Sequence, residues 1–193
     1  MKMKMITMAG GLACVFATTA MPISAEEIHN AVSGSTLSLG EADGAPLGSV
    51  NHSTSKPLKK NGKKFNKEGS KGVTNSKTSP VGFSPEDCGG GFLYTYDYAY
   101  GVSTTANGDL VTLALDPEPD PNDLSKFSKL CVFGGVYQAT LYQKITQGTG
   151  EYEGACGWIE TNVEGAFLGL DTTMTAYVGE QVGEIFVGDD CPL

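Results

Sequence analysis

The chain has 193 residues, a mass of 20.2 kDa and a formal net charge of −9 at pH 7. It contains no arginine, and its only histidines, His29 and His52, stand in a segment that we expect to lie outside the folded part. This composition disfavours hydrolysis that needs a histidine base, metal sites built from imidazole and phosphate chemistry that needs an arginine clamp. We therefore expect a protein that is not an enzyme.

Residues 1–25 have the three parts of a secretory signal peptide. Two lysines precede an uncharged run over 5–17, and the small residue Ala25 stands just before two glutamates. The uncharged run is shorter than the roughly 20 residues that span a bilayer, so we expect no transmembrane segment. The pattern predicts a secreted protein, extracellular or periplasmic. Lipid anchoring at Cys14 is the alternative, because the residues before it resemble a lipobox with its leucine displaced by one position.

Residues 26–80 are rich in serine, glycine and lysine and contain only isolated apolar residues. Such a segment cannot bury enough apolar surface to offset the entropy of ordering the chain. Within it, residues 51–79 hold eight lysines and a single acidic residue, Glu68. We expect 26–80 to be a disordered, basic tether.

The lysines of this tether would attract an anionic polymer such as lipopolysaccharide, teichoic acid or nucleic acid through salt-dependent electrostatics. Neither arginine nor interleaved aromatic residues accompany them. We therefore expect no specific nucleic-acid binding.

Residues 81–193 form the predicted folded domain, which is acidic, with three lysines against 17 aspartates and glutamates. Short runs of β-branched and aromatic residues alternate there with turn residues, and Asn107-Gly108 suits a hairpin turn. We expect an antiparallel β-sandwich, or a barrel, of about six to eight strands. The predicted strands are 92–103, 109–115, 129–145, 151–162, 166–178 and 182–188.

Four cysteines remain after the signal peptide, which predicts two disulfides in an exported protein. They are Cys88, Cys131, Cys156 and Cys191. Sequence alone does not choose among the three connectivities. We favour a bridge between Cys88 and Cys191, which flank the predicted domain. A zinc site is disfavoured, because no two of these cysteines are close neighbours in the chain.

Carboxylates alternate along a proline-rich loop that resembles the first part of a calcium-binding loop. Pro121 and Phe127 stand where an EF-hand needs glycine and glutamate. The three prolines instead favour a stiff acidic surface loop, with calcium as the alternative and no other cofactor expected. The candidate metal ligands are Asp116, Glu118, Asp120 and Asp123.

Aromatic residues stand at every second position from Phe92 to Tyr100, so a regular strand would project all of them from one face. Exposed, they would form a platform that stacks on sugar rings or on another protein; buried, they would face the core. Trp158, the only tryptophan, presents the same two alternatives. The candidate ligand-binding residues are Tyr94, Tyr96, Tyr98, Tyr100 and Trp158.

The sequence therefore favours a secreted, non-enzymatic binding or adhesion module whose partner is a carbohydrate or a cell-surface protein. Three alternatives stay open: a structural component of an extracellular matrix or surface, a small hydrolase using two carboxylates, and an exported inhibitor or toxin.

Overall fold

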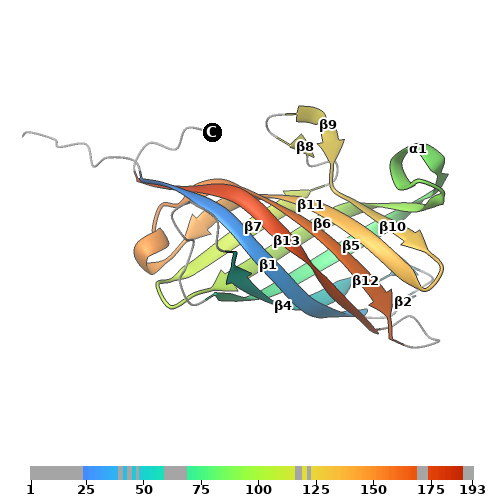
Figure 1. Cartoon of the computed structure of the whole chain (residues 1–193), viewed down its shortest axis with the longest axis horizontal. Helices are drawn as coiled ribbons and strands as arrows, with labels where there is room; N and C mark the ends of the chain where they lie inside the picture. Colours follow the sequence, from blue (N-terminus) through green and yellow to red (C-terminus); the bar gives the residue numbers. More distant parts are fainter. Residues whose placement is uncertain are drawn as a thin grey trace, which may run out of the picture.

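The computed structural model describes residues 24–38, 41–42, 45–46, 48–58, 69–115, 119–120, 123–168 and 174–188 (Figure 1). Nine strands form one antiparallel sheet, and two strand pairs and two short helical turns complete these ranges. The strands of the large sheet are β1 (Ser24–Ser38), β4 (Ser49–Pro57), β5 (Ser70–Ser84), β6 (Gly91–Thr104), β7 (Asp109–Leu115), β10 (Lys129–Phe133), β11 (Val136–Gly148), β12 (Cys156–Phe167) and β13 (Met174–Val187).

The large sheet closes on itself as a barrel. Its order is β10-β11-β12-β13-β1-β4-β5-β6-β7, and β10 and β7 also pair with β6 and β11 respectively. β10 and β7 therefore share one place between β6 and β11, which leaves eight positions around the barrel. Of the two predicted all-β architectures, the barrel is confirmed and the sandwich is not found. The two small pairs are β2 (Glu41–Ala42) with β3 (Ala45–Pro46) and β8 (Pro119–Asp120) with β9 (Asp123–Phe127).

The prediction of a disordered tether over 26–80 is wrong for three segments, because β1, β4 and β5 are adjacent barrel strands. Residues 59–68 lie outside the described residues. His29 and His52, expected outside the folded part, stand in β1 and β4. The folded unit therefore includes strands well before residue 81.

The physical reason is the composition of the barrel interior. Alternate residues of β4 and β5 face inward, and many of them carry hydroxyl groups, as Ser55 and Ser70 do, whose hydroxyls lie 2.6 Å apart. Interior and exterior side chains alternate along every barrel strand, but here the inward residues of these strands are small and polar. An alternation of apolar and polar residues, the usual sequence signal of a strand, is therefore missing from β4 and β5.

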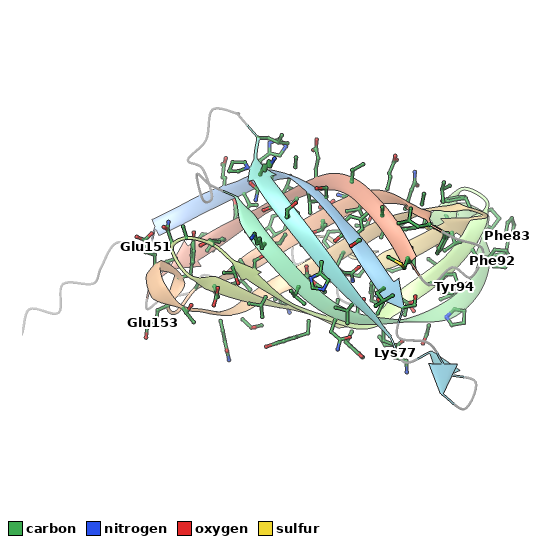
Figure 2. All side chains as sticks on the ribbon, turned by 90° about the horizontal axis from the view of Figure 1, so that it is seen from below. Lys77, Phe83, Phe92, Tyr94, Glu151 and Glu153 are labelled. Atoms are coloured by element: carbon green, nitrogen blue, oxygen red, sulfur yellow. A yellow bond between two sulfur atoms is a disulfide. The ribbon has the colours of Figure 1, made fainter. Side chains whose placement is uncertain are left out.

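One end of the barrel is filled by an apolar cluster, which we call the plug. It is formed by Ile28, Ile145, Tyr152, Ala155, Ile159 and Ile185, with Val187 packed against it. Tyr152 comes from the helical turn η1 (Gly150–Tyr152), which joins β11 to β12. Figure 2 shows Glu151 and Glu153 of this connection at the end opposite Phe83 and Phe92.

The other end, which we call the mouth, carries the single turn of helix α1 (Pro85–Cys88) between β5 and β6. Ser84 caps it by accepting a hydrogen bond from the Asp87 backbone amide, and Gly89 ends it with a left-handed conformation. A disulfide joins Cys88 of this turn to Cys131 of β10.

The favoured bridge between Cys88 and Cys191 is wrong, because Cys88 pairs with Cys131. The physical reason is that β6 and β10 are paired at the mouth, which places α1 next to Cys131. Cys156 is also disulfide-bonded. Cys191 lies outside the described residues.

The hairpin predicted at Asn107-Gly108 is confirmed between β6 and β7, where the Thr105 amide donates to the Gly108 carbonyl at 2.9 Å. The predicted strand over 166–178 instead divides between the end of β12 and the start of β13. Among the described residues, no helix is long and apolar enough to cross a membrane.

Candidate functional site: a cavity inside the barrel

A cavity of about 500 Å³ lies inside the barrel, between the plug and the mouth. Pockets for small molecules in proteins have volumes of about 300–1,000 Å³, so this one has the size of a ligand site. An eight-stranded barrel is just wide enough to be filled by side chains or to hold one small ligand. None of the lining residues is charged.

The lining is divided into two walls of different chemistry. The first, which we call the hydroxyl wall, lies on β1, β4 and β5. The second, the apolar wall, is formed by apolar side chains of β10, β11 and β12, and the polar lining residues Gln143 and Thr161 stand on the same strands. β4 and β11 are on opposite sides of the barrel, so the walls face each other across the cavity. The hydroxyl wall contains Thr36, Ser38, Ser49, Asn51, Ser53, Thr74, Ser76 and Thr78, and the apolar wall contains Leu130, Ala139, Leu141, Val163 and Phe167.

Hydrogen bonds between strands hold part of the hydroxyl wall in place. The hydroxyls of Ser49 and Ser76 lie 3.0 Å apart, and the Asn51 amide donates to Ser76 at 3.4 Å. Thr36 donates to the Asn51 side-chain oxygen. These side chains are therefore arranged before any ligand enters.

Three hydroxyls of the same wall, those of Ser38, Thr74 and Thr78, have no hydrogen-bond partner among the described residues. Two of them, those of Thr74 and Thr78, line the cavity from β5. Because a hydroxyl can both donate and accept, each offers a polar contact to a molecule in the cavity.

Three tyrosines enter the cavity from different strands: Tyr96 from β6, Tyr137 from β11 and Tyr177 from β13. The Tyr137 hydroxyl lies 3.1 Å from that of Thr175, and Tyr177 is hydrogen-bonded to Ser53. The aromatic rings supply apolar surface, while their hydroxyls remain available for polar contacts.

Glycines on neighbouring strands make room for two of these rings. Tyr137 pairs with Gly165, Gly165 with Tyr177, and Tyr177 with Gly34. A Cβ atom on Gly165 would overlap the Tyr137 ring, and one on Gly34 would lie 2.5 Å from the Tyr177 hydroxyl oxygen. The row continues to Ser53 on β4. Large and small residues thus alternate around the barrel, which leaves space for the cavity.

The environment keeps all three tyrosines in the neutral form. Burial raises the pKa of Tyr177 to about 12, with a further rise from nearby Tyr137. Burial likewise raises the pKa values of Tyr137 and Tyr96. At neutral pH these side chains therefore act as hydroxyl donors and acceptors, not as phenolates.

Asn30 lies inside the barrel, next to the cavity and above the plug. It is one interior position from Val32, which lines the cavity, and one from Ile28, which belongs to the plug. Its side chain is 1% exposed, and neither its amide nitrogen nor its oxygen has a hydrogen-bond partner among the described residues. A buried amide without partners costs about 1–3 kcal/mol of stability.

The aromatic residues of β6 do not share one face, contrary to the sequence-based expectation. Thr78 of β5 pairs with Tyr96, but the preceding Lys77 pairs with Tyr98, so Asp97 is an extra residue in β6. Such a bulge shifts the alternation of side chains by one position. Tyr96 therefore enters the cavity, whereas Tyr100 is 49% exposed on the outside.

Tyr98 and Tyr100 follow this bulge in the chain, and Tyr94, which pairs with Leu130 of β10, lies near the mouth (Figure 2). Phe83 and Phe92 at the mouth are both exposed and meet edge to face, with ring centroids 6.1 Å apart. The predicted aromatic stripe is thus divided between cavity, mouth and outer surface.

Trp158 is partly exposed on β12, between Lys144 of β11 and Glu184 of β13. It does not line the cavity.

The side chains of the four predicted metal ligands lie outside the described residues. For Asp116 and Glu118 the backbone lies outside them as well. The backbones of Asp120 and Asp123 pair in the small sheet of β8 and β9. Within the described part of the chain, no group of three or more metal-binding side chains occurs.

Of the predicted ligand-binding residues, the cavity contains Tyr96 alone. Tyr137 and Tyr177 were missed, although each stands in an alternating segment. The feature that marks these two residues as interior is the pairing of each tyrosine with a glycine on the next strand. This pairing can be recognised only when the register of the strands is known.

Comparison with known proteins identifies no relative of this chain. No protein-family model, no curated protein and no solved structure matches the chain. The function is therefore argued from the cavity.

Proposed function

We propose that the protein is an exported, non-enzymatic binding protein that holds a small molecule inside its barrel. The observation that carries this proposal is the cavity of about 500 Å³, in which hydroxyl groups and apolar side chains face each other. Binding sites for small molecules combine such apolar surface with a few placed polar groups. The signal peptide predicted at residues 1–25 supports an extracellular or periplasmic location.

The lining also bears on the alternative of a hydrolase. Two-carboxylate hydrolysis needs an acid and a second carboxylate beside the substrate, and no lining residue is an aspartate or glutamate. The acidic side chains of Glu151 and Glu153 lie at the plug end of the barrel (Figure 2). Binding without chemistry is the function that these positions support.

The site differs from the outer aromatic platform, which is one of the two alternatives that the sequence offers for the tyrosines of β6. Tyr98 and Tyr100 remain on the outside and keep their predicted role in contacting a carbohydrate or a cell-surface partner. The cavity offers a ligand more contact, because it surrounds the molecule instead of touching one side of it.

A screen of small neutral molecules by thermal shift tests the proposal, using a matched pair of variants. Ala139→Phe places a ring in the cavity, whereas Ala176→Phe adds the same ring on the exposed face of β13. Val163→Phe, on the strand paired with Ala139, is a second blocking variant in case the first fails to fold.

We expect compounds that raise the melting temperature of the wild type and of Ala176→Phe but not of the blocked variants. Stabilisation that is unchanged in Ala139→Phe and Val163→Phe would place the ligand elsewhere and overturn the proposal. An absence of any stabilising compound in a broad screen would count against it equally.

A further inference from the structure

The charge of the lining restricts the ligand, if the cavity is the binding site as proposed above. The molecule as a whole is strongly acidic, yet no charged side chain lines the cavity. An ion that enters such a site loses its hydration without gaining an opposite charge, which is costly. The three tyrosines are neutral as well, because the ordinary tyrosine pKa of 10.0 is well above neutral pH and burial raises it further.

The hydroxyl wall restricts the ligand further. Thr74 and Thr78 stand four residues apart on the same face of β5, and their hydroxyls have no hydrogen-bond partner among the described residues. Same-face positions in a strand repeat every two residues, or about 7 Å, so these two hydroxyls stand about 13–14 Å apart along the wall. Ser76 lies between them and is already hydrogen-bonded to its neighbours. A ligand that satisfies both threonines must carry several polar groups along its length.

The apolar wall supplies the opposite requirement. Leu141 and Val163 face the hydroxyl wall from β11 and β12, together with the other apolar side chains named above. A molecule that is polar all around would leave polar groups unpaired where they face Leu141 and Val163. The ligand therefore needs one apolar face or an apolar end.

From these three properties we infer that the ligand is an uncharged, polyhydroxylated molecule with an apolar face, of the class of neutral glycosides. It lies with its hydroxyls on Thr74 and Thr78 of β5 and its apolar face against Leu141 and Val163. This inference rests on the proposed function and names the class of molecule that the same cavity takes.

Two probes of nearly equal shape separate charge from size. Phenyl β-D-glucopyranoside is neutral, and phenyl β-D-glucuronide carries a carboxylate in place of the primary alcohol. Cyclohexylbenzene serves as a third probe, which is apolar and has no hydroxyl. Their dissociation constants are measured with the whole purified protein by isothermal titration calorimetry.

The glucopyranoside is expected to bind about tenfold more tightly than the glucuronide. The double variant Thr74→Val, Thr78→Val removes both hydroxyls with little change in shape, and should weaken glucopyranoside binding by about tenfold. Thr104→Val is the control, because Thr104 is exposed near the end of β6. It should leave the affinity unchanged.

Each contrary result has a distinct meaning. Equal affinity for the glucuronide would overturn the neutral-ligand inference while the proposed binding function stands. Tightest binding of cyclohexylbenzene, with the threonine variants unaffected, would overturn the use of the hydroxyl wall. If the compound screen identifies cavity ligands but none of them is a glycoside and the glucopyranoside does not bind, the class is wrong and the function remains. Failure of the proposed function itself is read from the blocking variants at Ala139 and Val163.

Discussion

The ring of Tyr137 on β11 lies across Gly165 on β12, in the space that a side chain at residue 165 would occupy. The atoms nearest to a Cβ placed there all belong to the Tyr137 side chain. The position therefore requires glycine because of one neighbouring ring, and not because of its own backbone. This contact shapes one side of the cavity.

Gly165→Ala should destabilise the protein by about 1–3 kcal/mol, because the added methyl group forces the Tyr137 ring to move. Denaturant unfolding measures the change. Gly135→Ala is the control, since nothing lies within 4 Å of a Cβ at that position, and it should change stability little. In the double variant with Tyr137→Leu the cost of Gly165→Ala should largely disappear. Additive effects of the two substitutions would contradict the contact.

Stability should fall as the pH rises above about 10. The unfolded tyrosines lose their protons near the ordinary pKa of 10.0, whereas burial holds the pKa of folded Tyr177 at about 12. Over this range the folded state binds more protons than the unfolded state, so the free energy of unfolding decreases with pH until the folded group also ionises. Below pH 10 these tyrosines should contribute no pH dependence.

Tyrosine ultraviolet absorbance and urea unfolding at a series of pH values measure this effect. Tyr177→Phe should make the decrease in stability above pH 10 less steep. An unchanged slope in this variant, together with titration of all tyrosines near pH 10, would show that the hydroxyls are exposed to water.

The bridge between Cys88 and Cys131 should be found by peptide mapping without reduction, and the second bridge should join Cys156 to Cys191. Replacing Cys88 and Cys131 together by serine should destabilise the protein by about 2–5 kcal/mol. A cross-linked peptide containing Cys88 and Cys191 would contradict the connectivity at the mouth.

Replacing Asn30 by leucine should raise stability by about 1 kcal/mol, because it removes a buried amide that has no partner among the described residues. Asn30→Ala should instead destabilise the protein, since the space that the amide group occupied is left empty. Thermal and denaturant unfolding compare the two variants. A clear loss of stability in Asn30→Leu would mean that the amide is hydrogen-bonded in solution.

The sequence predicts β6 and β7 well, because they alternate apolar and polar residues and are separated by the turn residues Asn107-Gly108, whereas the bounds of β12 and β13 differ from the predicted strands. It does not predict β1, β4 and β5 as strands. Their inward positions hold residues such as Ser53 and Thr74, which line a cavity instead of an apolar core. The hydropathy pattern predicts strands whose inward residues are apolar, and it does not predict strands whose inward residues carry hydroxyl groups.

The candidate site was predicted even less completely, for a reason of register. Because Asp97 is an extra residue in β6, Tyr98 and Tyr100 face outward while Tyr96 faces the interior. No pattern in the local sequence predicts this bulge. Tyr98 and Tyr100 therefore do not lie on the face that regular alternation predicts for them. Tyr137 and Tyr177 line the cavity because each pairs with a glycine on a neighbouring strand, and this pairing depends on contacts between residues far apart in the sequence.

A crystal structure of the protein soaked with phenyl β-D-glucopyranoside tests the central claim most directly. The account predicts density for the ligand inside the barrel, with hydroxyls near Thr74 and Thr78 and the phenyl ring toward Leu141 and Val163. Density found only on the outer surface beside Tyr98 and Tyr100, with an interior that stays free of ligand, would contradict it.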